Sequence, residues 1–142
     1  MENSEQFKIF IVDDDLFCAK IYENYLISLE YTDITHFTNG NDCLAHLNLN
    51  PDIIFLDHNM DDITGFEVLK KIKSHNADIY VIMISGQQAV KTAVDVLKSG
   101  AFDYITKESD VCQDISVIMD KITKIKEGSL KSNSITSGYF NK

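Results

Sequence analysis

The chain has 142 residues, of which 44% are hydrophobic and 25% are charged. This length is typical of a single domain with a sizeable core, and the composition is that of a globular protein, which excludes a disordered one. The formal net charge of −9 disfavours direct binding of nucleic acid, because an acidic chain gains nothing from releasing phosphate counterions.

Short apolar runs alternate with segments of helical period along most of the chain. The expected strands are Lys8–Val12, Ile34–Phe37, Ile53–Leu56, Tyr80–Ile84 and Asp103–Thr106. The expected helices lie near Leu16–Leu29, Asn41–Leu47, Phe66–Ser74, Ala89–Lys98 and Asp110–Lys126, with Gly100 ending the fourth. Most of the strands are almost continuously apolar, which is typical of strands covered on both faces. We therefore predict an α/β fold, a five-stranded doubly wound parallel sheet with five helices.

The two ends of the chain differ in composition from the part between them. After Glu127 the sequence becomes GSLKSNSITSGYFNK, which is rich in Ser, Asn and Gly. We predict an N-terminal extension over residues 1–6, one domain over residues 7–126, and a flexible tail or linker stub over residues 127–142.

The cysteines and the N-terminus bear on the compartment. Cys18, Cys43 and Cys112 stand far apart without C-x-x-C spacing, which predicts neither a disulfide framework nor a zinc site. We expect them to be small buried hydrophobic residues in a reducing cytoplasm. The first residues, MENSEQFK, do not have the pattern of a signal peptide, and no apolar stretch is long enough to span a bilayer. We expect a cytoplasmic protein without membrane contact.

Polar side chains follow four of the five expected strands. In an open parallel sheet, ligands bind beyond the carboxyl ends of the strands. The second strand offers little there, whereas the others deliver Asp13, Asp14, Asp15, Asp57, Asn59, Ser85, Tyr104 and Lys107. Clustered carboxylates are tolerated when a hard cation lies among them, and oxygen ligands suit Mg²⁺. An aspartate can also accept a phosphoryl group covalently, with a metal ion and a lysine opposing the transferred charge.

Four segments carry a resemblance to a known family: FIVDDD, PDIIFLDHNMDDITGFEVLKKIK, VIMISG and SGAFDYITK. From about Phe7 to Lys126 the chain resembles a response-regulator receiver domain of two-component signalling, similar to the single-domain chemotaxis type. The resemblance implies a flavodoxin-like fold with strand order 2-1-3-4-5 and phosphorylation of Asp57. It also implies the remaining site residues: Asp13, Asp14, Asp57 and the backbone carbonyl of Asn59 for Mg²⁺, Ser85 and Lys107 for the phosphoryl group, and Tyr104 as the aromatic switch.

The resemblance further implies the partners and the mode of action. A phosphohistidine on a histidine kinase or phosphotransfer protein would donate its phosphoryl group to Asp57. Ser85 would then move toward the phosphoryl group and leave space for Tyr104. This change would reshape the face of the fourth helix, fifth strand and fifth helix, where a downstream protein or a second copy of the chain would bind. The protein is then a switch that performs only its own phosphoryl transfer and dephosphorylation, not a turnover enzyme.

Three positions depart from the family pattern. Glu108 stands where the family commonly has a proline after the switch lysine, often with a cis bond. A cis bond before a non-proline residue costs ~2.5–4 kcal/mol, so we expect a trans peptide here. Asp61 replaces another usual proline and adds negative charge near the site. Gly86 leaves the phosphoryl group open to water, so we expect a fairly labile phosphoaspartate.

Two other functions stay open. One is a Mg²⁺-dependent phosphatase with an aspartyl nucleophile, which generally needs a second carboxylate where this chain has Asn59. The other is an atypical receiver that acts only as a binding module, a reading that Glu108 and Asp61 keep open. His36, His46 and His75 share no metal-ligand spacing, and we expect a structural or surface role for them. We expect His58, next to Asp57, to be a loop or partly exposed histidine.

Overall fold

The computed structural model describes residues 6–86 and 90–128. It divides into two compact units, Met1–Val111 and Cys112–Lys142. The first unit contains the sheet and four helices, and helix α5 (Val111–Lys126) falls almost entirely in the second. Most of the predicted C-terminal tail, residues 129–142, lies outside the described residues.

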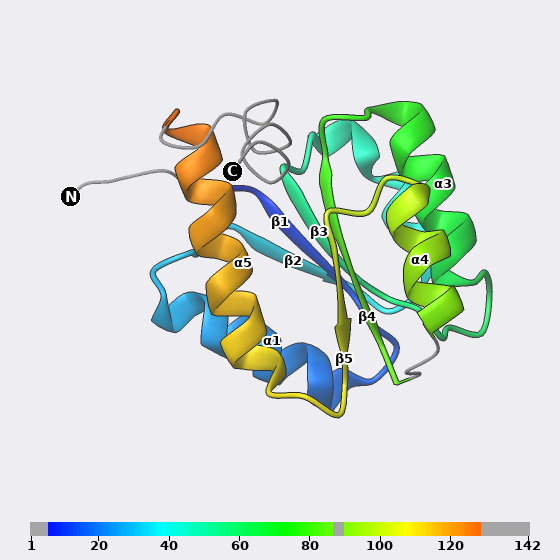
Figure 1. Cartoon of the computed structure of the whole chain (residues 1–142), viewed down its shortest axis with the longest axis horizontal. Coiled ribbons are helices and arrows are strands. Elements are labelled where there is room, and N and C mark those ends of the chain that lie inside the picture. The colour runs from blue at the N-terminus through cyan, green and yellow to red at the C-terminus, as the bar shows by residue number, and fades with distance from the viewer. Residues whose placement is uncertain (1–5, 87–89, 129–142) are drawn as a thin grey trace. The chain divides into compact units, whose positions relative to one another are not determined.

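Within the described residues, five parallel strands form one sheet in the order β2-β1-β3-β4-β5 (Figure 1). They are β1 (Ile9–Val12), β2 (Ile34–Phe37), β3 (Ile53–Asp57), β4 (Tyr80–Ser85) and β5 (Asp103–Thr106). The predicted fold and strand order are confirmed. The predicted strand limits differ from the observed ones by at most one residue. The third and fourth strands are each one residue longer than predicted, so that Asp57 and Ser85 belong to the sheet.

Three helices of the first unit, α1 to α3, begin after side chains that cap them. Asp15 precedes α1 (Leu16–Ser28), Asn39 precedes α2 (Gly40–Ala45), and Thr64 precedes α3 (Gly65–His75); each side chain accepts a hydrogen bond from the first turn. A short 3₁₀ turn, η1 (Leu47–Leu49), follows α2. After α4 (Val90–Lys98), Gly100 adopts a φ of 109°, the left-handed conformation expected for a glycine that ends a helix.

Both faces of the three central strands, β1, β3 and β4, are buried, as their apolar sequences predicted. Alternate strand residues such as Phe10, Ile54 and Met83 form one cluster with Val68 of α3 and Val96 of α4. Helix α1 lies on the other side of the sheet from α3 and α4 (Figure 1). The carboxyl ends of the strands therefore lie at one edge, between helices that cover the two faces.

The cysteines are all free, but only one is buried. Cys43 belongs to the apolar cluster, whereas Cys18 and Cys112 are partly exposed. The prediction of three buried cysteines is wrong for these two, because each lies in the first turns of a helix, near its exposed end. Among the described residues, no helix is both long and apolar enough to cross a membrane.

Helix α5 has the predicted amphipathic pattern. Its buried residues, Ile115, Ile118, Met119 and Ile122, recur at three- and four-residue steps. Lys124 and Lys126 occupy its last turn, where positive charge is favourable.

Candidate functional site

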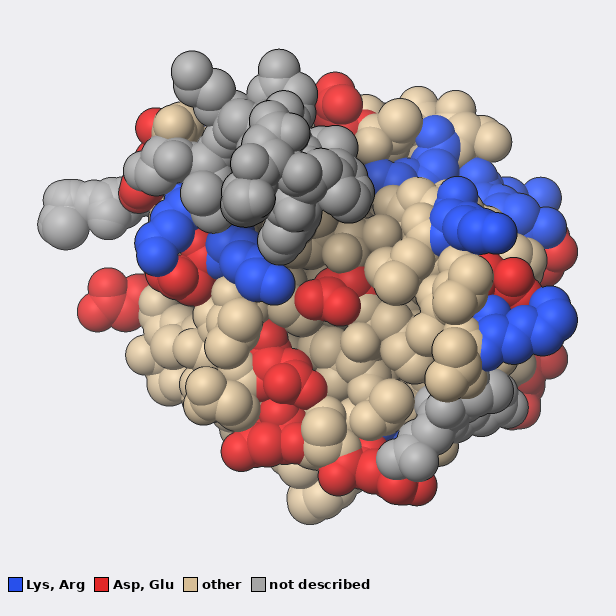
Figure 2. Space-filling view, in the orientation of Figure 1, with Lys and Arg blue, Asp and Glu red and all other residues tan. Residues whose placement is uncertain are grey.

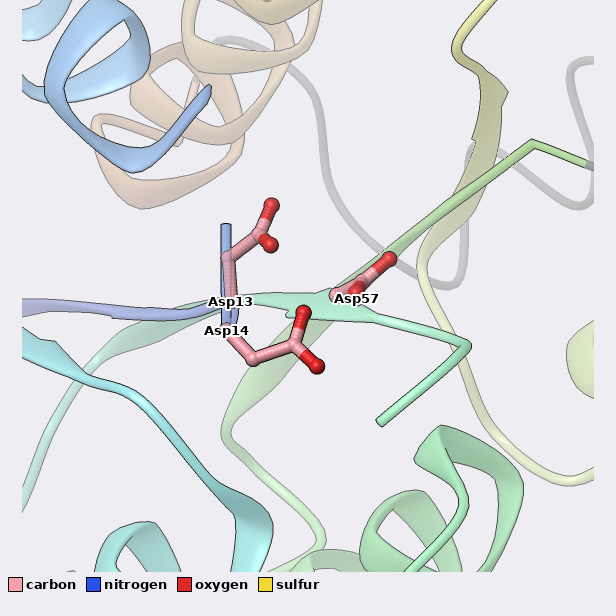
Figure 3. A group of neighbouring side chains, drawn as sticks. All are labelled: Asp13, Asp14 and Asp57. Atoms are coloured by element: carbon pink, nitrogen blue, oxygen red, sulfur yellow. The ribbon is translucent and has the colours of Figure 1, made fainter. Parts of the chain in front are cut away.

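Three carboxylates meet where β1 and β3 end (Figure 3). Each of Asp13, Asp14 and Asp57 offers an oxygen, and these oxygens all lie within 4.8 Å of one another. Asp13 and Asp57 are only 2% and 4% exposed, whereas Asp14 is exposed. The structure thus brings together the acidic residues that the sequence predicted to converge.

The backbone around Asp13 is held by β2 and by the turn that follows. The Asp13 N–H donates to the carbonyl of Phe37 at 3.0 Å, and the Asp13 carbonyl lies 2.9 Å from Nε2 of His36. Its Oδ1 accepts a hydrogen bond from the N–H of Asp15 at 2.8 Å. The side chain of Asp15 accepts from the N–H of Phe17 at 3.0 Å. The third adjacent carboxylate therefore caps α1, and Asp13 and Asp14 remain for the pocket.

The backbone next to Asp57 is held by hydrogen bonds to β4 and to the start of α3. The N–H of His58 donates to the carbonyl of Ile84, and the N–H of Gly65 donates to the carbonyl of His58, both at 2.9 Å. A Cβ at Gly65 would lie 2.5 Å from the carbonyl oxygen of Asp57. The first turn of α3 therefore contacts the backbone of Asp57 directly, and this contact requires glycine at position 65.

The loop after Asp57 is tied to α2 by Asp62. Its two carboxylate oxygens accept from the N–H groups of Gly40 at 3.3 Å and Asn41 at 2.9 Å. Burial would raise the pKa of Asp62, but these N–H donors outweigh it and lower the pKa. Asn59 and Asp61, in the same loop, are exposed. Asp62 thus restrains a loop that contains Asp61 in place of the usual proline.

Lys107 reaches the carboxylates from the end of β5. Its N–H donates to the carbonyl of Ser85 at 2.7 Å, and its Nζ lies 3.3 Å from Oδ1 of Asp57 and 3.7 Å from Oδ2 of Asp13. The Lys107–Glu108 peptide is trans, since no cis bond occurs among the described residues. The absence of proline at position 108 therefore does not remove the lysine from the pocket.

Ser85 and Tyr104 lie on neighbouring strands close to the pocket. Ser85 is completely buried at the end of β4, and it pairs in register with Thr106 of β5. Tyr104 pairs with Met83 and is partly buried against the apolar cluster. The two residues are thus two positions apart along the β4–β5 pair, with Ser85 nearer to the edge that carries Asp57.

The pocket carries an excess of negative charge. Burial raises the pKa of Asp57 to about 6; the Asp13 carboxylate adds to this effect and Lys107 opposes it. Burial also raises the pKa of Asp13. For Lys107, burial would lower the pKa, but the carboxylates of Asp13 and Asp57 outweigh it and raise the pKa. One ammonium group therefore faces more than one buried carboxylate.

Two carboxylate oxygens in this pocket suit a cation. Oδ2 of Asp13 and Oδ1 of Asp57 are buried and receive no hydrogen bond from the described residues. Among the described residues they have only the ammonium of Lys107 as a counter-charge, at 3.7 and 3.3 Å, and a hard divalent cation satisfies carboxylate oxygens of this kind. The donor set therefore fits a divalent cation such as Mg²⁺.

Lysines gather over the surface that α3 and α4 cover (Figure 2). Their ammonium groups are partly neutralised by neighbours on the same helix. Lys70 lies 3.3 Å from Glu67, and Lys91 lies 2.9 Å from Asp95. These pairs reduce the net positive charge of this surface.

Comparison with known proteins decides the family. Residues 9–119 match the model of the response regulator receiver domain. The chain belongs to this family. The DNA-binding transcriptional regulator NtrC of Salmonella typhimurium is 30% identical to this receiver over 131 residues, 92% of the chain and 28% of that regulator. The curated relatives include much longer proteins, of which the receiver spans 24% to 31%.

Solved receiver structures have the same fold. The receiver domain of Francisella response regulator 1452 is 25% identical, with a TM-score of 0.78 over 85% of this chain and 99% of that one. The CheX-CheY-BeF₃-Mg²⁺ complex from Borrelia burgdorferi contains a chain that is 27% identical, with a TM-score of 0.76 over 82% of this receiver and 89% of that chain.

Three residues that hold the site in place were not predicted from the sequence. The second strand was expected to offer little, yet His36 and Phe37 at its end both bind the backbone of Asp13. Gly65 was not singled out, although its position eight residues after Asp57 at the start of a predicted helix was visible. The expectation of a partly exposed His58 is confirmed, and Met60 packs against the apolar cluster.

Proposed function

We propose that this receiver domain accepts a phosphoryl group on Asp57 from a phosphohistidine, with Mg²⁺ bound at the acidic pocket. The observation that carries the proposal is the group formed by Asp57, Asp13 and Lys107, in which two buried carboxylates face one ammonium within 3.7 Å. Such a group suits a transfer in which negative charge arrives and must be opposed at once.

In the proposed step, a carboxylate oxygen of Asp57 attacks the phosphorus atom of the phosphohistidine. The new P–O bond forms as the P–N bond breaks, and the imidazole of the donor leaves with the electron pair. Asp57 attacks as the carboxylate, and with a pKa of about 6 it is mostly ionised at neutral pH. Lys107 pairs with the transferred phosphoryl oxygens, and the hydroxyl of Ser85 donates to one of them.

Asp14 and Asp57 would hold the metal ion directly, with the backbone carbonyl of Asn59, and Asp13 would act through water. When bound, Mg²⁺ opposes the negative charge of the carboxylates and of the phosphoryl group. The buried oxygens of Asp13 and Asp57, which receive no hydrogen bond from the described residues and share one ammonium, support this assignment. The name of the Borrelia CheY complex includes Mg²⁺ and BeF₃.

The donor is proposed to dock beside the pocket, on the start of α1. Leu16, Phe17 and Ile21 are 64%, 74% and 40% exposed, although all three are large apolar residues. Leu16 and Phe17 follow Asp15 directly, and Ile21 lies one helical turn after Phe17 in α1, so the three flank the acidic pocket. A protein that presents a phosphohistidine to Asp57 would cover these side chains and gain from burying them.

The output is proposed to follow from Ser85 and Tyr104. Movement of the Ser85 hydroxyl toward the phosphoryl group would free space next to β5, and the partly buried Tyr104 would turn inward to fill it. The surface formed by α4 and β5 would change, and a downstream protein would read that change. In this proposal the chain is a switch and not a turnover enzyme, it works in the cytoplasm, and the receiver occupies residues 7–126.

Labelling by a small phosphodonor separates this function from the two alternatives. The wild type should gain one acid-stable, base-labile phosphoryl group when Mg²⁺ is present, and lose most of it in EDTA. Asp57→Asn should gain none, whereas Asp61→Asn, which removes an exposed carboxylate nearby, should still be labelled. A wild type without label would point to a binding module, and sustained phosphate release from several unrelated phosphate esters would point to a phosphatase.

A further inference from the structure

His36 reaches from β2 to the peptide that joins the two metal-site aspartates. In the register of β1 and β2, His36 pairs with Ile11, yet its ring extends further along to the carbonyl of Asp13. Nε2 lies 2.9 Å from that oxygen, and the contact is partly buried. Because a carbonyl can only accept a hydrogen bond, Nε2 carries the proton and donates.

The position of this bond matters, because β1 ends at Val12. Beyond that residue the regular strand pairing of β1 ends, and Asp13 and Asp14 lie in the turn that leads into α1. The N–H of Asp13 is held by the carbonyl of Phe37 at 3.0 Å, and the carbonyl of Asp13 is held by His36. The end of β2 thus holds both the N–H and the carbonyl of Asp13. The bond to the carbonyl also fixes the orientation of the peptide that joins Asp13 to the exposed Asp14.

We propose that His36 is a positioning residue for the divalent cation: its hydrogen bond orients the Asp13–Asp14 peptide so that both carboxylates point at the ion. This inference rests on the proposed Mg²⁺ site. Partners that orient metal ligands from outside the coordination shell affect affinity, and their loss typically costs about tenfold or more. Without the bond, the Asp14 carboxylate must be ordered when the ion binds, so affinity falls.

The test is a Mg²⁺ titration of the unphosphorylated chain by isothermal calorimetry, which measures binding directly and needs no phosphotransfer. His36→Phe keeps a ring of similar size but lacks the donor, and we expect its Mg²⁺ Kd to rise roughly tenfold. His36→Gln keeps an N–H donor, and we expect its Kd to stay within about threefold of the wild type, as conservative rescue requires.

A matched control exists at His46, the residue that follows α2. Its Nδ1 lies 2.7 Å from the carbonyl of Asp42, a ring-to-backbone contact of the same kind that does not involve Asp13, Asp14 or Asp57. His46→Phe should bind Mg²⁺ as the wild type does. Urea unfolding without Mg²⁺ shows whether each variant folds, and His36→Val, which suits an edge strand, replaces His36→Phe if the latter does not fold.

The outcomes separate the inference from the proposed function. A weakened Kd for His36→Phe with recovery in His36→Gln supports the positioning role. Equal Mg²⁺ affinities of the wild type and His36→Phe overturn the positioning role. A Kd of His36→Gln as high as that of His36→Phe also overturns it. In both cases the proposed Mg²⁺ site itself stands. A wild type that binds no Mg²⁺ overturns the proposed metal site and the inference with it.

Discussion

The buried carboxylate of Asp57 should make the folded protein less stable at neutral pH than a variant without that charge. The pKa of Asp57 is raised from 3.8 to about 6, first by burial and then by the Asp13 carboxylate. A carboxyl whose pKa is higher in the folded than in the unfolded state binds its proton more tightly when folded. Its stabilising contribution is fully present below the unfolded value of 3.8 and is lost as the pH rises through about 6.

The size of the effect follows from the two pKa values. The difference between about 6 and 3.8 is roughly two pKa units, and at about 1.36 kcal/mol a unit it corresponds to ~3 kcal/mol at pH 7.5. Asn at position 57 removes the charge but also leaves Lys107 with one carboxylate fewer. We therefore expect Asp57→Asn to raise the free energy of unfolding by about 1–3 kcal/mol at pH 7.5 and to have little effect near pH 4.

Urea unfolding of the wild type and Asp57→Asn, at several pH values between 4 and 8 without divalent cations, measures this difference. Asp120→Asn is the control, because it removes the same charge from an exposed position of α5 that pairs with Lys124. Its effect should stay below about 0.5 kcal/mol at every pH. Adding Mg²⁺ should stabilise the wild type and narrow its gap to Asp57→Asn. A variant that is less stable than the wild type at pH 7.5, or a difference independent of pH, would refute the reasoning.

Three further variants test the site and its surroundings. Gly65→Ala places a Cβ 2.5 Å from the Asp57 carbonyl oxygen and should lower the free energy of unfolding in urea by ~2 kcal/mol or more. Gly86→Ala is the control, because its added Cβ meets open space, and it should have little effect. Equal effects of the two substitutions would contradict the contact between Gly65 and Asp57. Phe17→Ser should slow phosphoryl transfer from a phosphohistidine protein at least about fivefold but leave the rate of labelling by a small phosphodonor unchanged. If both reactions were slower, Phe17 would act in the phosphoryl-transfer step and not in docking of the donor. Lys73→Met removes the hydrogen bonds that the Lys73 ammonium donates to the carbonyls of Ala77 and Ile79, so it should lower the free energy of unfolding by roughly 1–2 kcal/mol. The Mg²⁺ Kd should stay unchanged. A changed Kd would show that this contact is coupled to the acidic pocket.

The fold could be predicted closely from the sequence, because most of the strands are nearly continuous apolar runs and the helices show a helical period or an end signal. Gly100 after α4 and the periodic isoleucines of α5 are examples. The convergence of Asp13, Asp57 and Lys107 followed from parallel topology alone, because the carboxyl ends of parallel strands share one edge.

What the sequence could not predict depends on contacts between distant segments. The bond from His36 to the Asp13 carbonyl needs the register of β1 and β2 and the direction of a side chain at the end of an edge strand. Likewise, Asp15 was one of three equivalent carboxylates until the start of α1 assigned it to the helix cap. The hydrogen bonds from Gly40 and Asn41 to Asp62 join the start of α2 to the loop after Asp57, and no local sequence pattern predicts that these segments lie close together.

The central claim is that Asp57 itself carries the phosphoryl group, and locating the modified residue tests it most directly. The wild type, treated with a small phosphodonor and Mg²⁺, is reduced with borohydride, which converts an acyl phosphate of aspartate to homoserine, and is then mapped by peptide mass spectrometry. We predict homoserine at position 57, with Asp13, Asp14, Asp61 and Asp62 unchanged. Homoserine at any of these four positions, or at none in protein that carries label, would contradict the account.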